Sequence, residues 1–148
     1  MNRKITRTVR GDLDEKFLVR ASGDDVLNVR LMIRHDRPNT TSRVAILVLA
    51  SDRARVTVNA TAIIERSAPN TNAWLEIRVI TRGSAVATAA PNLEIRNDAV
   101  KAGHALSTKH VSDDELFYLM SRGLSRTAAE NLILDAFTRP FRNGRIIQ

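Results

Sequence analysis

The chain has 148 residues, of which 23 are Lys or Arg and 16 are Asp or Glu, so its formal net charge is +7. This length suits one domain that buries about 70% of its unfolded surface and needs neither a disulfide nor a metal to fold. The absence of cysteine excludes disulfide frameworks, cysteine-ligated zinc, thiolate nucleophiles and self-contained thiolate-ligated iron–sulfur sites.

No segment is predicted to cross a membrane, because the longest unbroken apolar run, residues 44–50, is far shorter than the span of about 20 residues that a bilayer requires. The basic residues near the start are not followed by the apolar region of a secretory signal. The expected location is therefore the cytoplasm.

Apolar and polar residues alternate in short segments from about residue 16 to residue 106, which is typical of β-strands. Segment 43–50 is nearly all apolar and is expected to be buried on both faces. Later segments, at 85–90, 92–95 and 99–105, predict strands of only a few residues. A β-sandwich and a β-solenoid would both produce this pattern, and no clean repeat period is evident.

Two features favour the solenoid. The later segments are short and contain small residues, and no Asn-Gly or Asp-Gly pair marks a two-residue hairpin between the predicted strands. The small residues expected to point inward are Ala85, Ala87 and Ala89.

The apolar spacing then changes from two to 3.6 residues, which predicts helices. Ser112 and Glu115 form a capping box at the start of a first helix, and Gly123 ends it. Ser125 begins a second helix. We expect one compact unit made of two parts, a β domain at residues 1–111 and a helical hairpin with a frayed tail at residues 112–148.

The positive charge raises the question of nucleic-acid binding. Of the basic residues, 19 are Arg, but no three are consecutive and acidic residues interrupt nearly every group. Only Phe17 and Trp74 offer rings for base stacking before residue 112. A solvated basic surface is the favoured interpretation, and a nucleic-acid-binding β domain is the alternative.

Few residues combine into a catalytic or metal-binding set. His104, His110 and Asp113 would supply metal ligands, but their spacing matches no established motif, so structural roles are favoured. His35 is expected in a loop rich in Pro, Asn and Thr. The glycines form no phosphate-binding loop, and no Gly-x-Ser-x-Gly sequence occurs. The chain is therefore not expected to be an enzyme.

The first helix of the hairpin presents Phe117, Tyr118 and Met120 close together, followed by Arg122. A two-helix hairpin cannot bury all of these side chains itself. Aromatic residues, Met and Arg are enriched at protein interfaces. Packing against the β domain and an exposed docking surface both agree with this pattern.

Residues 91–137 resemble the C-terminal signature of the SufB/SufD family of iron–sulfur cluster assembly proteins. The family pattern runs Pro-x-Leu-Glu-Ile, then Asp-Val-Lys-Cys-Ser-His-Gly-Ala-Thr, then Leu-Phe-Tyr-Leu-x-Ser-Arg-Gly-Ile, and the order is kept here. The matching positions are Pro91, Leu93 to Ile95, Asp98, Val100, Lys101, His104, Leu116 to Leu119, and Ser121 to Gly123.

The resemblance implies a right-handed parallel β-helix followed by helices that dock on the ATPase subunit SufC. It also implies that two β-helices pair, and that ATP-driven dimerisation of SufC distorts the pair so that a nascent cluster can form. Carried over by position, Glu94 and His104 belong to the cluster-assembly interface. The ATPase-docking residues are Leu116, Phe117, Tyr118, Ser121, Arg122 and Gly123.

The chain also departs from the family pattern. It is far shorter than family members and is expected to begin within the β-helix. Ala102 stands where the pattern has Cys, and Leu106 and Ser107 replace Thr-Val. Without a thiolate the chain cannot supply sulfur ligands alone. We expect a non-catalytic, SufD-like scaffold that binds no cofactor stably by itself, shares a transient iron–sulfur cluster in a complex, and pairs with a SufB-like partner or a second copy.

Overall fold

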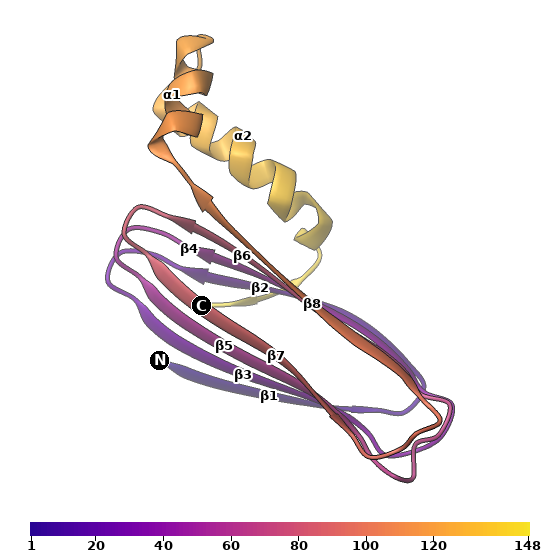
Figure 1. Ribbon diagram of the computed structural model, residues 1–148. Coiled ribbons are helices and arrows are strands. Elements are labelled where there is room, and N and C mark those ends of the chain that lie inside the picture. Colours follow the sequence, from indigo (N-terminus) through magenta and orange to yellow (C-terminus); the bar gives the residue numbers. More distant parts are fainter.

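The computed structural model describes residues 1–148 and contains two parallel β-sheets followed by two helices (Figure 1). Its elements are β1 (Asn2–Val9), β2 (Asp12–Ala21), β3 (Val26–His35), β4 (Thr41–Ala50), β5 (Arg55–Ile64), β6 (Asn72–Arg82), β7 (Val86–Ile95), β8 (Lys101–Val111), α1 (Asp113–Ser121), α2 (Arg126–Thr138), the 3-10 turn η1 (Arg139–Phe141) and β9 (Arg145–Ile147). One sheet has the order β1-β3-β5-β7, and the other has the order β8-β6-β4-β2-β9.

Two successive strands, one in each sheet, make one coil of a β-solenoid with about four coils. Neighbouring coils keep a nearly constant register. Val26 lies beside Arg55, and Arg55 lies beside Val86, so the spacings are 29 and 31 residues. The predicted parallel β-helix with a C-terminal helical hairpin is therefore confirmed. The spacing varies because the turns differ in length, which hides the repeat in the sequence.

Every second residue of a strand fills the interior, because successive side chains of a strand point to opposite faces. In β3, Val29, Leu31 and Ile33 are buried, whereas Asn28 and Arg30 are exposed. The small residues predicted to point inward in the last coil do pack against this core, and they are Ala85, Ala87 and Ala89.

The helices lie over the outer face of the sheet that contains β4 (Figure 1). As predicted, β4 is buried on both faces: Ile46 belongs to the interior core, and Leu47 belongs to a second apolar cluster under the helices. Leu116 of α1 and Ala129 of α2 are also buried in this second cluster. The hairpin is thus attached to one side of the solenoid.

Left-handed residues recur at equivalent turns of successive coils. Gly23, Asp52 and Gly83 have φ angles of 59°, 63° and 66°. The carboxylate of Asp52 accepts a hydrogen bond of 3.0 Å from the backbone N–H of Gly23, which ties two turns together. At the other turns, Asn39 and Asn70 both have a φ of 58° and are joined by a side-chain hydrogen bond of 3.2 Å. A repeated Pro-Asn-Thr sequence before β4 and β6 is the sequence signal of this repeat.

Three predictions about the strands are wrong. The strands begin at Asn2, not near residue 16. The later strands are long, since β7 continues through Pro91 and β8 has 11 residues. Because β7 is at the edge of its sheet, the missing N–H of a proline is tolerated there. The C-terminal tail is also not frayed: it forms β9 beside β2, and Phe141 and Ile147 are buried.

Candidate functional site

The last coil leaves one end of the solenoid open, because no strand lies beyond β7 or β8. His104 and Leu106 of β8 lie beside the buried residues Leu75 and Ile77 of β6, so they continue two columns of the core. Both are nevertheless exposed, because no further coil covers them. This uncovered edge of β7 and β8, the open end, is the first candidate site.

His104 has a defined ring orientation. Its Nδ1 atom lies 2.9 Å from the backbone carbonyl oxygen of Pro91, and since a carbonyl only accepts, Nδ1 donates. In the neutral ring the free lone pair then lies on Nε2. A carbonyl that holds one ring nitrogen in this way is typical of histidines that ligate a metal through the other nitrogen. His104 is thus chemically able to supply one nitrogen ligand.

Glu94 of β7 takes part in a different set of contacts. Its carboxylate pairs with Arg96 at 3.2 Å, and Arg96 also pairs with Glu65 at 2.8 Å. Glu65 in turn pairs with Arg34 at 2.7 Å, which makes a ladder of charges across three coils. Such exposed pairs each contribute little to stability. Glu94 and His104 therefore share the last coil, but they have separate partners and the structure does not bring them together.

The second candidate site is the hairpin, which begins at the predicted capping box. The backbone N–H of Glu115 donates to the Ser112 hydroxyl at 3.2 Å, and the N–H of Ser112 donates to the Glu115 carboxylate at 3.1 Å. The Lys109 ammonium donates to the same carboxylate at 2.6 Å and lowers the pKa of Glu115. Leu116 is 1% exposed within the second cluster, so it anchors α1 and is not available to a partner.

The other side of α1 is exposed. Phe117 is 73% exposed and Tyr118 is 58% exposed. The Arg122 guanidinium lies 5.4 Å from the centroid of the Tyr118 ring, and its Nη2 donates to the Tyr118 hydroxyl at 3.3 Å. The Ser121 hydroxyl donates to the Tyr118 carbonyl at 2.6 Å, and Gly123 ends the helix with a φ of 96°. We call Phe117, Tyr118 and Arg122 the hairpin surface. Its residue types dominate the binding energy of protein interfaces.

Residues 8–137 match a protein-family model described as SUF system FeS cluster assembly, SufBD core domain. This chain belongs to the SufBD family of iron–sulfur cluster assembly proteins. The resemblance found in residues 91–137 is thereby confirmed, and it extends to the first coil. No helix of this SufBD-family chain is long and apolar enough to cross a bilayer.

The relatives of this SufBD-family chain are longer proteins. It is 34% identical over 131 residues to the iron–sulfur cluster assembly protein SufD of Bacillus subtilis (strain 168), an alignment that covers 88% of this chain and 30% of that protein. It is 28% identical over 115 residues to SufD of Escherichia coli (strain K12), covering 77% and 27%. It is 31% identical over 108 residues to SufB of Bacillus subtilis (strain 168), covering 72% and 23%. The chain therefore spans less than a third of the length of these relatives.

The histidines of this SufBD-family chain do not form a metal site with one another. No group of three or more His, Cys, Asp or Glu side chains is placed to hold a metal ion. His110 has its Nδ1 3.0 Å from the Thr81 hydroxyl, whereas Asp113 pairs with Arg126 at 3.1 Å. The set of His104, His110 and Asp113 considered from the sequence is thus not brought together.

His35 lies inside the solenoid and not in a loop, which corrects the sequence-based expectation. It ends β3 and is fully buried. Its Nδ1 lies 2.7 Å from the Thr40 hydroxyl and its Nε2 lies 2.8 Å from the Ser42 hydroxyl. Burial lowers the pKa of His35. The signal was present in the sequence, because His35 continues the alternation of inward residues two positions after Ile33.

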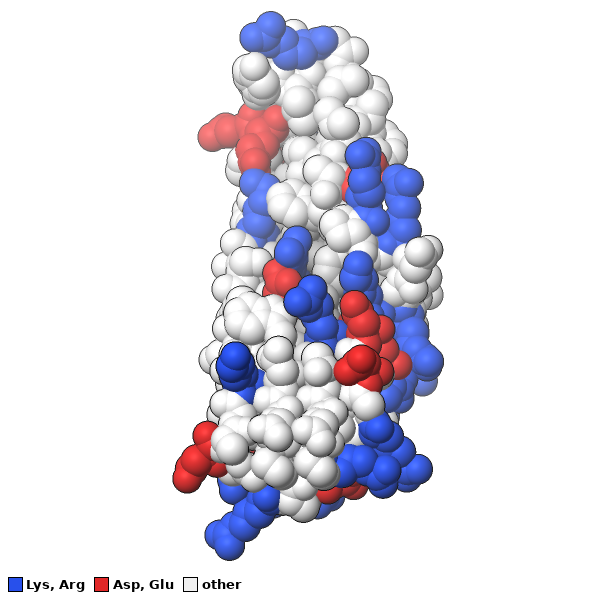
Figure 2. Space-filling model, turned by 90° about the vertical axis from the view of Figure 1, so that its right-hand side faces the viewer, with Lys and Arg blue, Asp and Glu red and all other residues white.

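The basic surface does not gather into one patch. Figure 2 shows Lys and Arg side chains along the whole length of one face, with acidic side chains between them. Several basic side chains of the chain are paired with acidic ones, as in the contact of 2.7 Å between Arg53 and Asp24. Nucleic-acid sites usually combine clustered basic residues with aromatic platforms. Nothing in the arrangement favours this alternative function.

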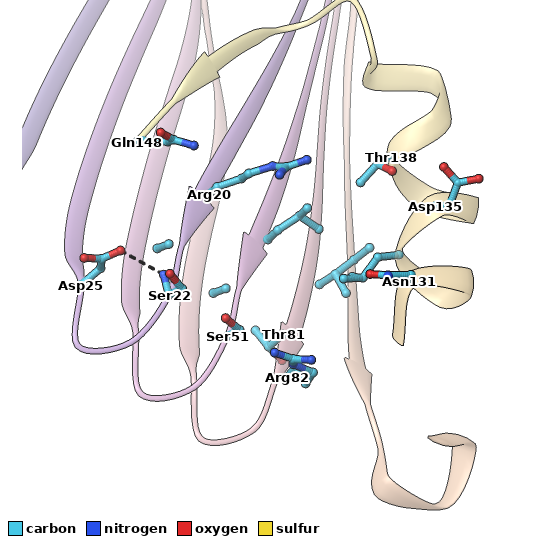
Figure 3. A pocket seen from close by; sticks show the side chains of 15 residues that line it. Arg20, Ser22, Asp25, Ser51, Thr81, Arg82, Asn131, Asp135, Thr138 and Gln148 are labelled. Carbon is cyan, nitrogen blue, oxygen red and sulfur yellow. Dashed lines mark hydrogen bonds between the residues drawn. The ribbon is translucent and has the colours of Figure 1, made fainter. Parts of the chain in front are cut away.

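A groove of about 840 Å³ lies between α2 and the sheet (Figure 3). Arg20 and Thr81 line it from the strands, and Asn131 lines it from α2. The second cluster holds the hairpin along its length, through Ala129 near the start of α2, through Ile133, Leu134 and Phe137 further along the helix, and through Phe141 beyond its end. The groove therefore lies beside a helix that is attached to the sheet.

Proposed function

We propose that this chain is a non-catalytic scaffold subunit of a SufBCD-type complex. In this proposal the hairpin surface docks a SufC-like ATPase, and the open end meets a SufB-like partner or a second copy of the chain. The iron–sulfur cluster is the cargo of the complex and is shared only transiently by this chain. The exposed hairpin surface on an anchored helix is the observation that carries the proposal.

The docking role is supported by the contrast between the two sides of α1. Leu116 is buried on the sheet, while Phe117 and Tyr118 are largely exposed. Neighbouring exposed apolar side chains often mark a protein-interaction site. Arg122 is already held over Tyr118, so less side-chain entropy is lost when a partner binds. Because α1 is capped at the end of β8, a force on the hairpin would act directly on the last coil.

The pairing role is supported by the open end. Its uncovered strand edges and exposed apolar residues, such as Ile95 and Leu106, favour association with another strand or surface. His104 lies there with its Nδ1 held by the Pro91 carbonyl oxygen. Since the chain has no cysteine, the sulfur ligands of a shared cluster would have to come from the partner. This favours a cysteine-bearing, SufB-like protein on the other side.

Co-purification with a SufC homologue tests the docking role. The chain should retain the ATPase, and the double variant Tyr118→Ala plus Arg122→Glu should lose it. A matched control is Val26→Ala plus Arg55→Glu, which changes an exposed apolar residue and an exposed basic residue that are neighbours in register on the solenoid. Binding that survives the hairpin variant as well as it survives the control would refute the assignment.

A further inference from the structure

The first coil of the solenoid carries charges at positions that are apolar in the next coil. Arg7 lies in register with Ile33, and Glu15 lies in register with Val44. Both apolar partners are fully buried in the core. Because residues in register in a parallel sheet share a face, Arg7 and Glu15 point inward at the end of the core. Inward-pointing charges are a known way of protecting a sheet edge from further pairing.

These two charges form a close, partly buried pair. The Arg7 Nε lies 3.0 and 2.8 Å from the two carboxylate oxygens of Glu15, and the side chains are 26% and 15% exposed. The Arg7 guanidinium also lies 6.0 Å from the ring centroid of Phe17, a core residue. Arg145 of β9 approaches the same carboxylate to 3.7 Å. The end of the core is therefore covered by an ionic layer.

The C-terminal tail covers the same end. It runs from α2 back to β2, where β9 adds a short parallel strand and Ile147 enters the core (Figure 1). The Lys16 ammonium donates to the Pro140 carbonyl at 3.0 Å, and Arg3 donates to the Gln148 carbonyl at 3.2 Å. At Gly144 a Cβ atom would lie 3.0 Å from the Lys16 carbonyl oxygen, so the close approach of the tail favours glycine.

The two ends of the solenoid therefore differ. The open end presents free strand edges and exposed apolar residues, including Leu106. Without its cover, the first coil would offer the matching parallel edges of β1 and β2. Stacking the open end of one copy on the first coil of the next is a head-to-tail contact, and such contacts that do not close produce filaments.

We propose that Arg7, Glu15 and the tail strand β9 form an end cap, which stops the open end of a second copy of this chain from stacking on β1 and β2. Stacking would remove water from the Arg7–Glu15 ion pair and would give the two charges no new hydrogen-bond partners, which is energetically unfavourable. It would also require β9 to leave β2. Association is thereby confined to the open end. This inference does not depend on the proposed function.

Sedimentation velocity over a range of protein concentrations tests the end cap. The variant carries Arg7→Leu and Glu15→Leu and lacks residues 139–148. Its mean mass should rise severalfold with concentration, while that of the unaltered chain stays at one or two copies. The matched control is the same truncation with Asp24→Leu and Arg53→Leu, which removes an ion pair whose side chains are 74% and 72% exposed. It should form smaller assemblies, because its end still carries the ionic layer.

Adding Leu106→Lys to the variant distinguishes ordered stacking from general aggregation, because it places a charge in the open end. Stacked assemblies should then disappear, and assemblies that persist would overturn the proposal. A folded variant whose mass does not change with concentration would overturn it as well. If the truncated chain does not fold, the full-length chain with Arg7→Leu, Glu15→Leu and Ile147→Asp takes its place. Its mean mass should also rise with protein concentration, and a mass that stays constant would overturn the proposal.

Discussion

Replacing His35 with leucine is expected to lower the free energy of unfolding by about 1–3 kcal/mol, although leucine fills much of the same space. The substitution removes both ring nitrogens, which lie 2.7 and 2.8 Å from the hydroxyls of Thr40 and Ser42. Thr40 keeps its contact of 3.2 Å with Thr71, whereas Ser42 loses its side-chain partner. A buried hydroxyl without a partner costs about 1–3 kcal/mol. For a chain of this size each kcal/mol lowers Tm by about 2–4 °C.

Urea unfolding followed by circular dichroism measures this loss, and a second variant tests its cause. In His35→Leu plus Ser42→Ala, the unpaired hydroxyl is gone, so most of the lost stability should return. If the double variant is no more stable than His35→Leu alone, the unpaired Ser42 hydroxyl is not the cause and the reasoning fails.

The same histidine predicts a pH dependence. Burial lowers the pKa of His35 in the folded chain below its ordinary value of 6.5, so the unfolded chain takes up the proton first as the pH falls. Stability is therefore fully present above about pH 6.5 and declines as the pH falls toward the lowered value, by at most about 1.4 kcal/mol per pH unit. The His35→Leu variant should show a flatter profile in this window. Parallel profiles of the two proteins would contradict the assignment.

Two further substitutions test the hairpin and the outer sheet face. Leu116→Ala should weaken the attachment of the hairpin by about 2–5 kcal/mol, because it leaves a cavity at a buried site. Faster proteolysis between α1 and α2 would measure this loss. The control is Leu132→Ala, which changes an exposed leucine, and equal cleavage of both variants would contradict the anchoring role. Gly103→Ala should displace the ring of Trp74, because a Cβ atom at residue 103 would lie 2.5 Å from that ring. Trp74 is the sole tryptophan, so the displacement should change the fluorescence emission spectrum of the protein. An unchanged spectrum would refute the contact.

Local patterns allowed several features to be predicted from the sequence. The apolar run of β4 predicted burial on both faces, and the Ser112–Glu115 capping box marked the start of α1. The sequence left open whether the aromatic residues of the first helix pack on the β domain or are exposed, and the structure exposes Phe117 and Tyr118. These features depend on residues close together in the chain. The motif in residues 91–137 also pointed to the correct family.

The features that were missed depend on contacts between distant residues. The burial of Ile147 requires that the tail return to β2, a pairing that no local pattern announces. The burial of His35 is an exception, because the alternation of inward residues through Ile33 already carried the signal. Pro91 suggested a break between two short strands. Only the sheet order reveals that this strand lies at an edge, where a proline is tolerated. Leu116 looked like a docking residue because its motif does not indicate which side of the helix meets the sheet.

The return of the tail also relates the length of the solenoid to the length of the hairpin. The hairpin leaves the sheet at β8, and the tail rejoins it as β9, four strand positions away. At about 4.8 Å per position, the chain between β8 and β9 crosses about 19 Å of the sheet. One more coil would move β2 another strand spacing away from β8, and the same hairpin would then no longer place β9 beside β2. The length of the hairpin and tail therefore matches a solenoid of about four coils.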